Sequence, residues 1–184
     1  MQNDFDPLRL HIAAFTQTGG SYSGTEPLLR FGRLIEEAEG LGDAEAVRFS
    51  LQGSLKSDPA GLDEPWIHLS ASTRLLQVCQ RCLGKVAVDL EFERDFRFVA
   101  SEALAEVEDE ESEEDVLVIS NAFNLLELIE DELLMAMPLV PKHEICPTPV
   151  KLKVTDPGFV SEPSNKLNPF AALQVLKKKD DGSV

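Results

Sequence analysis

The sequence is short of cysteine, of positive charge and of long apolar runs, and each shortage excludes a class of protein. Three cysteines among 184 residues are too few for a disulfide scaffold and, without a secretion signal, indicate reduced thiols in the cytosol. The amino terminus lacks a basic segment followed by an apolar stretch, so we expect no signal peptide. No apolar run approaches the roughly 20 residues of a membrane-spanning helix. We therefore expect a cytoplasmic protein with no membrane partner.

The shortage of positive charge restricts the possible partners. Lys and Arg number 17 against 33 Asp and Glu, which gives a formal net charge of −16. A phosphate backbone repels such a molecule at long range, so any RNA contact requires a local basic patch. The alternatives are that the protein binds a basic partner such as a ribosomal protein, or that the charge only keeps it soluble.

Residue patterns predict an α+β domain, in which two main helices cover an antiparallel sheet or partial barrel. Period-two alternation predicts strands over 47–56, 67–75 and 86–96, with a further short strand over 116–119. The second and third strands are expected to pair antiparallel. One helix is predicted from a Thr25 cap to glycines at 40 and 42, and another from an Asn124 cap to Pro138.

The remaining segments are predicted to lack long regular elements. The first twenty-five residues indicate a start segment and a loop. Between residues 102 and 115, nine of fourteen side chains are acidic, and their mutual repulsion predicts a mobile loop. Prolines break up the sequence beyond Cys146. We therefore expect one domain over 1–146 and a flexible tail over 147–184 that ends in a short helix.

The sharpest motif is the CxxC pair Cys79 and Cys82, which lies between the second and third strands and is followed by Gly84. Two thiolates at this spacing can bind one metal ion, and a nearby glycine permits a tight turn. His143 and Cys146, also with two residues between them, would complete a Cys3His zinc site. About sixty residues separate the halves, more than the roughly 15–20 of a compact zinc ribbon. The alternative is a turn with two inert cysteines.

Catalytic and redox interpretations have less support from the sequence. A thioredoxin-like pair opens a helix within a βαβ pattern, whereas this CxxC pair lies between strands. His143 and Cys146 have no evident orienting acid or oxyanion hole. The consecutive acids at 130–132 point in different directions on a helix, and one of them is expected to bond a neighbouring backbone group or basic side chain. The sequence therefore predicts no enzyme and no small-molecule substrate.

A basic group around the cysteine turn is the first candidate site for RNA or a protein partner. It comprises Arg74, Arg81 and Lys85, a small positive patch on an otherwise negative chain. The alternative is that these side chains pair with Asp89 or Glu91 across the hairpin. The lysines near the carboxyl terminus form a second basic group.

Several motifs together carry a resemblance to a known family. They are Cys79 to Leu83, the acidic block, Ile129 to Pro141, His143 with Cys146, and the ending Asn168-Pro169-Phe170-Ala171-Ala172-Leu173. In this order, over roughly residues 20–178, they resemble the YceD family of large ribosomal RNA subunit accumulation proteins.

The resemblance implies a ribosome-biogenesis factor without catalytic activity. Its expected role is in the synthesis, processing or stability of the 23S ribosomal RNA precursor. Expected partners are the pre-50S particle, that RNA or a basic ribosomal protein, and Asn168, Pro169 and Phe170 join the candidate partner-binding residues. The alternative function is a zinc- or redox-responsive regulatory binding protein built around the CxxC turn.

Overall fold

The computed structural model describes residues 6–40, 46–57, 61–110, 112, 114–148 and 154–159. The chain divides into two compact units, Met1–Pro149 and Val150–Val184, and every helix and strand given below belongs to the first. The helix predicted after Asn168 lies outside the described residues. Within the described ranges, no helix is long and apolar enough to cross a membrane.

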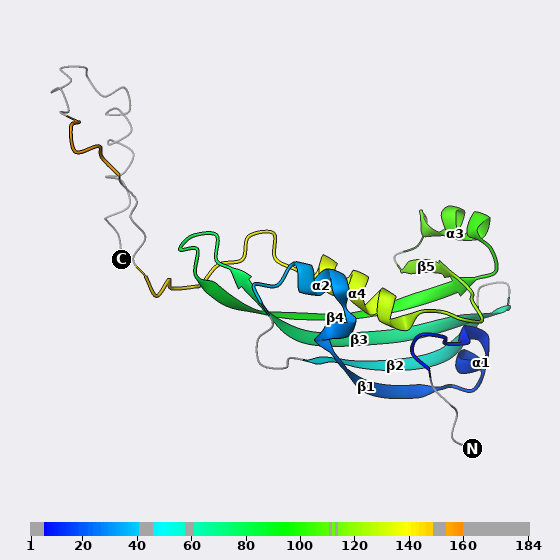
Figure 1. Cartoon of the computed structure of the whole chain (residues 1–184). Helices are drawn as coiled ribbons and strands as arrows, with labels where there is room; N and C mark the ends of the chain where they lie inside the picture. The colour runs from blue at the N-terminus through cyan, green and yellow to red at the C-terminus, as the bar shows by residue number, and fades with distance from the viewer. Residues whose placement is uncertain are drawn as a thin grey trace, which may run out of the picture. The chain divides into compact units, whose positions relative to one another are not determined.

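One open sheet of five strands forms the body of the first unit, and the strands follow one another in chain order (Figure 1). They are β1 (Ser21–Pro27), β2 (Ala46–Ser57), β3 (Asp63–Val78), β4 (Lys85–Val99) and β5 (Asp115–Val118). Neighbours are antiparallel except β5, which runs parallel to β4. The predicted α+β class and the antiparallel pairing of β3 with β4 are confirmed, and the sheet does not close into a barrel.

The long strands β3 and β4 carry the core because apolar and polar side chains alternate along them. In β3, Leu69 and Leu75 are buried, whereas Ser70 is partly exposed on the opposite face. In β4, Phe96 and Phe98 are buried on the same side as the leucines. Each such side chain stabilises the fold by roughly 1.5–3 kcal/mol when buried. A one-residue slip would expose them all, so burial fixes the register.

In the part of the chain that the structure describes, four α-helices and one 3-10 helix accompany the sheet. They are α1 (Ile12–Gln17), η1 (Leu28–Arg30), α2 (Gly32–Glu36), α3 (Glu102–Asp109) and α4 (Leu125–Met135). The apolar side chains of α1, α2 and α4 join the main core, and Figure 1 shows α2 and α4 along one side of the sheet. Cap and core residues of α4 lie where the sequence predicts them. Asn124 accepts a hydrogen bond from the Glu127 N–H at 3.3 Å, and Ile129 and Leu133 are fully buried.

An acidic side chain of α4 holds α2 in place. Glu130 accepts hydrogen bonds from the backbone N–H of Arg33 at 2.8 Å and of Leu34 at 3.3 Å. The Arg33 guanidinium also bonds Glu130 at 3.1 Å and Asp131 at 2.5 Å. This confirms that one of the three consecutive acids bonds a neighbouring backbone. It also gives the short helix α2 a fixed position on α4.

The prediction of one helix that begins at a Thr25 cap is wrong about where the helix starts and about its being continuous. Thr25 lies in β1 opposite Arg48, so its backbone belongs to the β1–β2 ladder and cannot begin a helix. Pro27 ends that strand because it has no N–H to extend the ladder. The helical region then forms as two pieces, η1 and α2, separated at Phe31.

The first twenty-five residues contain α1 and most of β1, which the loop prediction missed. His11 Nδ1 accepts a hydrogen bond from the Ala14 N–H at 3.3 Å and caps α1. The Phe15 ring of α1 packs so closely on Gly20 and Gly53 that a Cβ at either glycine would overlap it. Periodicity could not detect these elements, because α1 has only six residues and β1 consists mainly of small or polar residues.

The prediction of a mobile loop over the whole acidic block is also wrong, since α3 occupies its first half. Ala105 of α3 packs with Val99 and Val116 in a small second core. Arg97 bonds Glu108 of α3 at 2.6 Å. Apolar contact and one guanidinium thus offset part of the repulsion among the carboxylates. The short strand predicted after the block is confirmed as β5.

Candidate metal centre

The connection between β3 and β4 is a tight turn from Cys79 to Gly84. The Leu83 N–H donates to the Cys79 carbonyl at 2.8 Å, and the Cys79 N–H donates to the Gly84 carbonyl at 2.8 Å. Leu83 has a φ of 58°, a left-handed conformation that costs an L-residue roughly 1–2 kcal/mol. The sequence assigned the strained position to the glycine, whereas the backbone places it one residue earlier. This bend turns the Cys82 side chain back toward Cys79.

The segment after α4 lies against this turn, and its backbone carbonyls accept hydrogen bonds from the turn. The Gln80 N–H donates to the Pro141 carbonyl at 2.9 Å. Arg81 Nη2 donates to the His143 carbonyl at 2.5 Å and to the Glu144 carbonyl at 3.4 Å. These bonds bring the distant HxxC pair beside the CxxC pair. The long separation in sequence is therefore no obstacle to a shared site.

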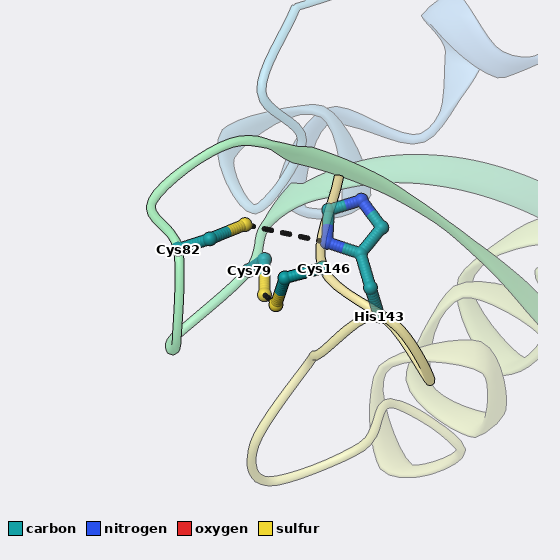
Figure 2. Close-up of side chains that lie close together, drawn as sticks. All are labelled: Cys79, Cys82, His143 and Cys146. Atoms are coloured by element: carbon teal, nitrogen blue, oxygen red, sulfur yellow. Dashed lines mark hydrogen bonds between the residues drawn. The ribbon is translucent and has the colours of Figure 1, made fainter. Parts of the chain in front are cut away.

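The four predicted ligands converge (Figure 2), and their donor atoms all lie within 4.8 Å of one another. The Sγ atoms of Cys79 and Cys146 are 3.9 Å apart, and Cys82 Sγ is 3.4 Å from His143 Nδ1. Tetrahedral zinc, with bonds of about 2.3 Å to sulfur and 2.0–2.1 Å to nitrogen, separates two sulfurs by roughly 3.8 Å and sulfur from nitrogen by roughly 3.5 Å. These residues therefore fit a tetrahedral metal ion.

The orientation of His143 suits a ligand. Its Nε2 atom is 3.0 Å from the Lys85 carbonyl oxygen. A carbonyl only accepts hydrogen bonds, so Nε2 carries the proton and Nδ1 keeps a free lone pair. Nδ1 is the atom that faces Cys82. A backbone carbonyl that fixes the ring and tautomer in this way is the usual support of a metal-binding histidine.

The electrostatics of the cluster favour one thiolate and oppose a second. Burial acts to raise the pKa of Cys79, which is fully buried. Hydrogen bonds from the backbone N–H groups of Cys82, His143 and Arg81 outweigh burial and lower this pKa to about 5. Burial raises the pKa of Cys146 to about 11, and its hydrogen bonds to the other two thiols act in the same direction. A bound dication would remove this conflict, because it stabilises every thiolate that coordinates it.

Each predicted basic partner-binding residue near the turn has a bond within the chain. Arg74 bonds Asp89 through two nitrogens, at 2.5 and 3.0 Å. Lys85 Nζ donates to the Glu39 carbonyl at 3.1 Å, and Arg81 holds the segment after α4. The other three candidates, at positions 168–170, lie outside the described residues.

Sequence reasoning missed the supporting groups of the site. The carbonyl groups of Lys85 and Pro141 orient the histidine and the turn, and backbone carbonyls leave no residue-type signal. Arg81 gave a signal, since it lies inside the CxxC pair, but its role in tying the two segments together required the fold. The ligands themselves were found because cysteine and histidine at a two-residue interval are rare enough to stand out.

Comparison with known families places the chain. A family model described as "Large ribosomal RNA subunit accumulation protein YceD" matches residues 67–177, more than half of the sequence. The chain belongs to the YceD family. The YceD match runs from within β3 to beyond α4 and includes all four candidate ligands. YceD membership gives the chain a role in the accumulation of large-subunit ribosomal RNA. No curated protein and no solved structure matches the chain.

Proposed function

We propose that this chain is a cytoplasmic binding factor, without catalytic activity, that supports synthesis, processing or stability of the 23S ribosomal RNA precursor. The convergence of four protein ligands from two distant segments carries the proposal. Catalytic zinc sites keep one position for water or substrate, whereas structural sites use four protein ligands. A Cys3His set therefore favours a centre that maintains shape over one that performs a reaction.

Zinc is the proposed metal, because three thiolates and one imidazole in a tetrahedron suit it best. Cys79 and Cys82 would bind it from the β3–β4 turn, and His143 and Cys146 from the segment after α4. The ion would supply a crosslink between these two parts of the chain. Within residues 79–84 and 139–146, which the structure describes, only Cys79 is buried, so the crosslink would be a main source of order in these two segments.

The two crosslinked segments present a surface that suits the proposed partners. Leu83, Leu139 and Ile145 have exposed fractions of 77%, 101% and 89%. Lys85 and Lys142 lie on the same segments of a chain whose net charge is −16. These two ammonium groups would attract an RNA phosphate locally. The contact proposed here is with the pre-50S particle, through its 23S precursor RNA or a basic ribosomal protein.

Metal analysis of the purified full chain tests the centre. We expect about one equivalent of zinc per chain, which is the occupancy of one four-ligand site. His143→Ala should lose most of it. His68→Gln, which removes an imidazole from the sheet, should keep it. Equal zinc in all three proteins, or none in the wild type, would refute the metal centre.

A complementation experiment tests the ribosomal role. Cells that lack the gene should show a reduced ratio of 50S to 30S subunits on sucrose gradients. Wild-type protein should restore the ratio, and a Cys79→Ser variant should restore less of it. A normal ratio in the deletion strain would contradict the proposed function, whatever the metal content of the protein.

A redox-responsive regulator is the second candidate, and the cysteine geometry supports it. Cys79 has a lowered pKa and lies 3.9 Å from the Cys146 sulfur. Two-electron oxidation by hydrogen peroxide would join these two sulfurs in a disulfide, while the O–O bond of the peroxide breaks and its oxygens leave as two water molecules that take up the thiol protons. The disulfide would remove two of the four ligands and so destroy the metal site. Zinc that stays bound at peroxide concentrations sufficient to oxidise free thiols would exclude this candidate.

A further inference from the structure

The face of the sheet turned away from α2 and α4 carries polar side chains over the middle of three strands. Strand register aligns Arg48, Ser72 and Glu91 in one row, and Ser50, Ser70 and Glu93 in the next. All six are exposed or partly exposed. α3 packs on this face only near Val99, roughly 20 Å further along β4 than Glu93.

These two rows form a groove with a volume of about 610 Å³. Its floor is low because the central residues are serines, and the hydroxyls of Ser50 and Ser70 lie 3.2 Å apart. Glu91 and Glu93 of β4 form one wall, and Arg48 of β2 forms the other. The groove therefore offers hydroxyl groups below and a negatively charged wall along one side.

Glu91 and Glu93, which form one wall of the groove, belong to a row of acidic side chains along β4 and are its least neutralised members. All four outward positions of β4 from Asp89 to Asp95 are acidic. Asp89 is paired with Arg74, and Asp95 with Lys56 at 3.4 Å. These pairs neutralise the two ends of the row, whereas its middle lacks a Lys or Arg partner among the described residues.

The two middle carboxylates remain available to a partner. Glu93 contacts His68 Nε2 at 3.1 Å, but its side chain is 72% exposed. Glu91 makes no hydrogen bond or ion pair within the part of the chain that the structure describes. Both point away from the core into the groove, so a cationic ligand could reach them without displacing an arginine or a lysine.

We propose that this groove binds an extended, lysine- or arginine-rich polypeptide segment. Alternate residues of an extended chain repeat every roughly 6.6 Å, the same interval that separates Glu91 from Glu93 along β4. Two cationic side chains of such a segment can therefore meet both carboxylates. The serine hydroxyls can bond the polar backbone of the segment, and small side chains let that backbone approach the sheet.

Charge decides between a polypeptide and a nucleic acid in this groove. Two carboxylates repel phosphate, so RNA is disfavoured here. Arg48 on the opposite wall restricts where the cationic side chains of a peptide can lie, and it directs them to the β4 side. The groove and the metal centre share no residue. This site therefore extends the proposed function without depending on the metal.

Fluorescence anisotropy with a labelled peptide of alternating lysine and serine, about ten residues long, tests the proposal on the full chain. Glu91→Gln/Glu93→Gln should weaken binding by about fivefold, the effect of removing two partly exposed ion pairs. Glu36→Gln/Glu37→Gln removes the same charge from two exposed residues at the carboxyl end of α2. The peptide affinity of this control variant should stay within about twofold of the wild type. Ser72→Val replaces a hydroxyl at the base of the groove with a larger apolar side chain that is favourable in strands. It should therefore also weaken peptide binding.

Several outcomes would overturn this proposal. Equal losses in the two glutamate variants would show that the peptide responds only to net charge. No measurable binding by the wild type would refute the site directly. An oligouridylate of similar length could also bind more tightly than the peptide and lose affinity in the Ser72→Val variant. That result would identify RNA, not a peptide, as the ligand of the groove. Peptide binding should survive removal of zinc with a chelator, so failure here is distinguishable from failure of the metal centre.

Discussion

The middle of the β3–β4 hairpin and its turn end are held together by different chemistry. In the middle, Leu69, Leu75 and Leu90 are buried in the main core with the helices. At the turn, Cys79 is buried, but Leu83 and Ile145 are almost fully exposed, and order depends on hydrogen bonds and the proposed zinc. The comparison shows that one strand pair can be fixed by apolar burial over most of its length and by ligation where burial ends.

Truncation of the core should have the largest effect and act on the whole domain. Phe98 is fully buried, and its ring meets Phe123 edge-on at 5.4 Å between centroids. Phe98→Ala should lower the free energy of unfolding by about 3–5 kcal/mol, with or without zinc, because it leaves a cavity. Urea denaturation measures this. A loss under about 1 kcal/mol would show that the sheet away from the turn does not depend on burial.

Removal of zinc should have a large but local effect. With a chelator, the Gln80 N–H, which donates to the Pro141 carbonyl, should exchange with solvent at least about tenfold faster, since local opening exposes it. The Leu69 N–H in the middle of β3 should change little. Hydrogen exchange followed by NMR reports both amides. Similar acceleration at the two amides would contradict the division between the regions.

In the metal-free protein, the pH dependence of the free energy of unfolding should come in part from Cys79 at the β3–β4 turn. The pKa of Cys79 is lowered to about 5 in the fold, so the unfolded state binds more protons at intermediate pH. The stability from this thiolate is therefore present above the unfolded pKa and is lost as pH falls toward about 5. Cys79→Ser should flatten that part of the stability curve. An unchanged curve would mean that the thiol does not ionise as described.

Relief of strain at the turn should have the smallest effect. Leu83→Gly removes a left-handed leucine, which costs roughly 1–2 kcal/mol, but adds the entropy cost of glycine, roughly 0.5–1 kcal/mol. We expect a net gain of about 0.5 kcal/mol in thermal or urea unfolding. Leu139→Gly, at an exposed position without positive φ, is the control and should give no gain. Destabilisation by Leu83→Gly would show that the leucine side chain itself supports the turn.

The sequence predicts the regions that depend on burial better than those that depend on special contacts. β3, β4 and α4 have apolar residues at the period of their structure, and Asn124 marks the start of α4. β1 has no such signal, because its serines and glycine present no apolar face. The α3 helix also escaped prediction, since Ala105 and Arg97 offset its charge only through tertiary contacts.

The metal centre shows a similar limit. Residue type and spacing identified Cys79, Cys82, His143 and Cys146, because few residues can act as soft ligands at a two-residue interval. Spacing could not show that the halves meet. That depends on the Lys85 and Pro141 carbonyls and on the left-handed Leu83, none of which has a sequence signature.

X-ray absorption at the zinc edge of the purified chain tests the proposed crosslink, because it counts ligands by element. We expect three sulfur neighbours at about 2.3 Å and one nitrogen neighbour at about 2.0–2.1 Å. His143→Ala should lose the nitrogen or the metal. A wild-type spectrum with two sulfurs or fewer, or with oxygen in place of nitrogen, would contradict a crosslink between the two segments.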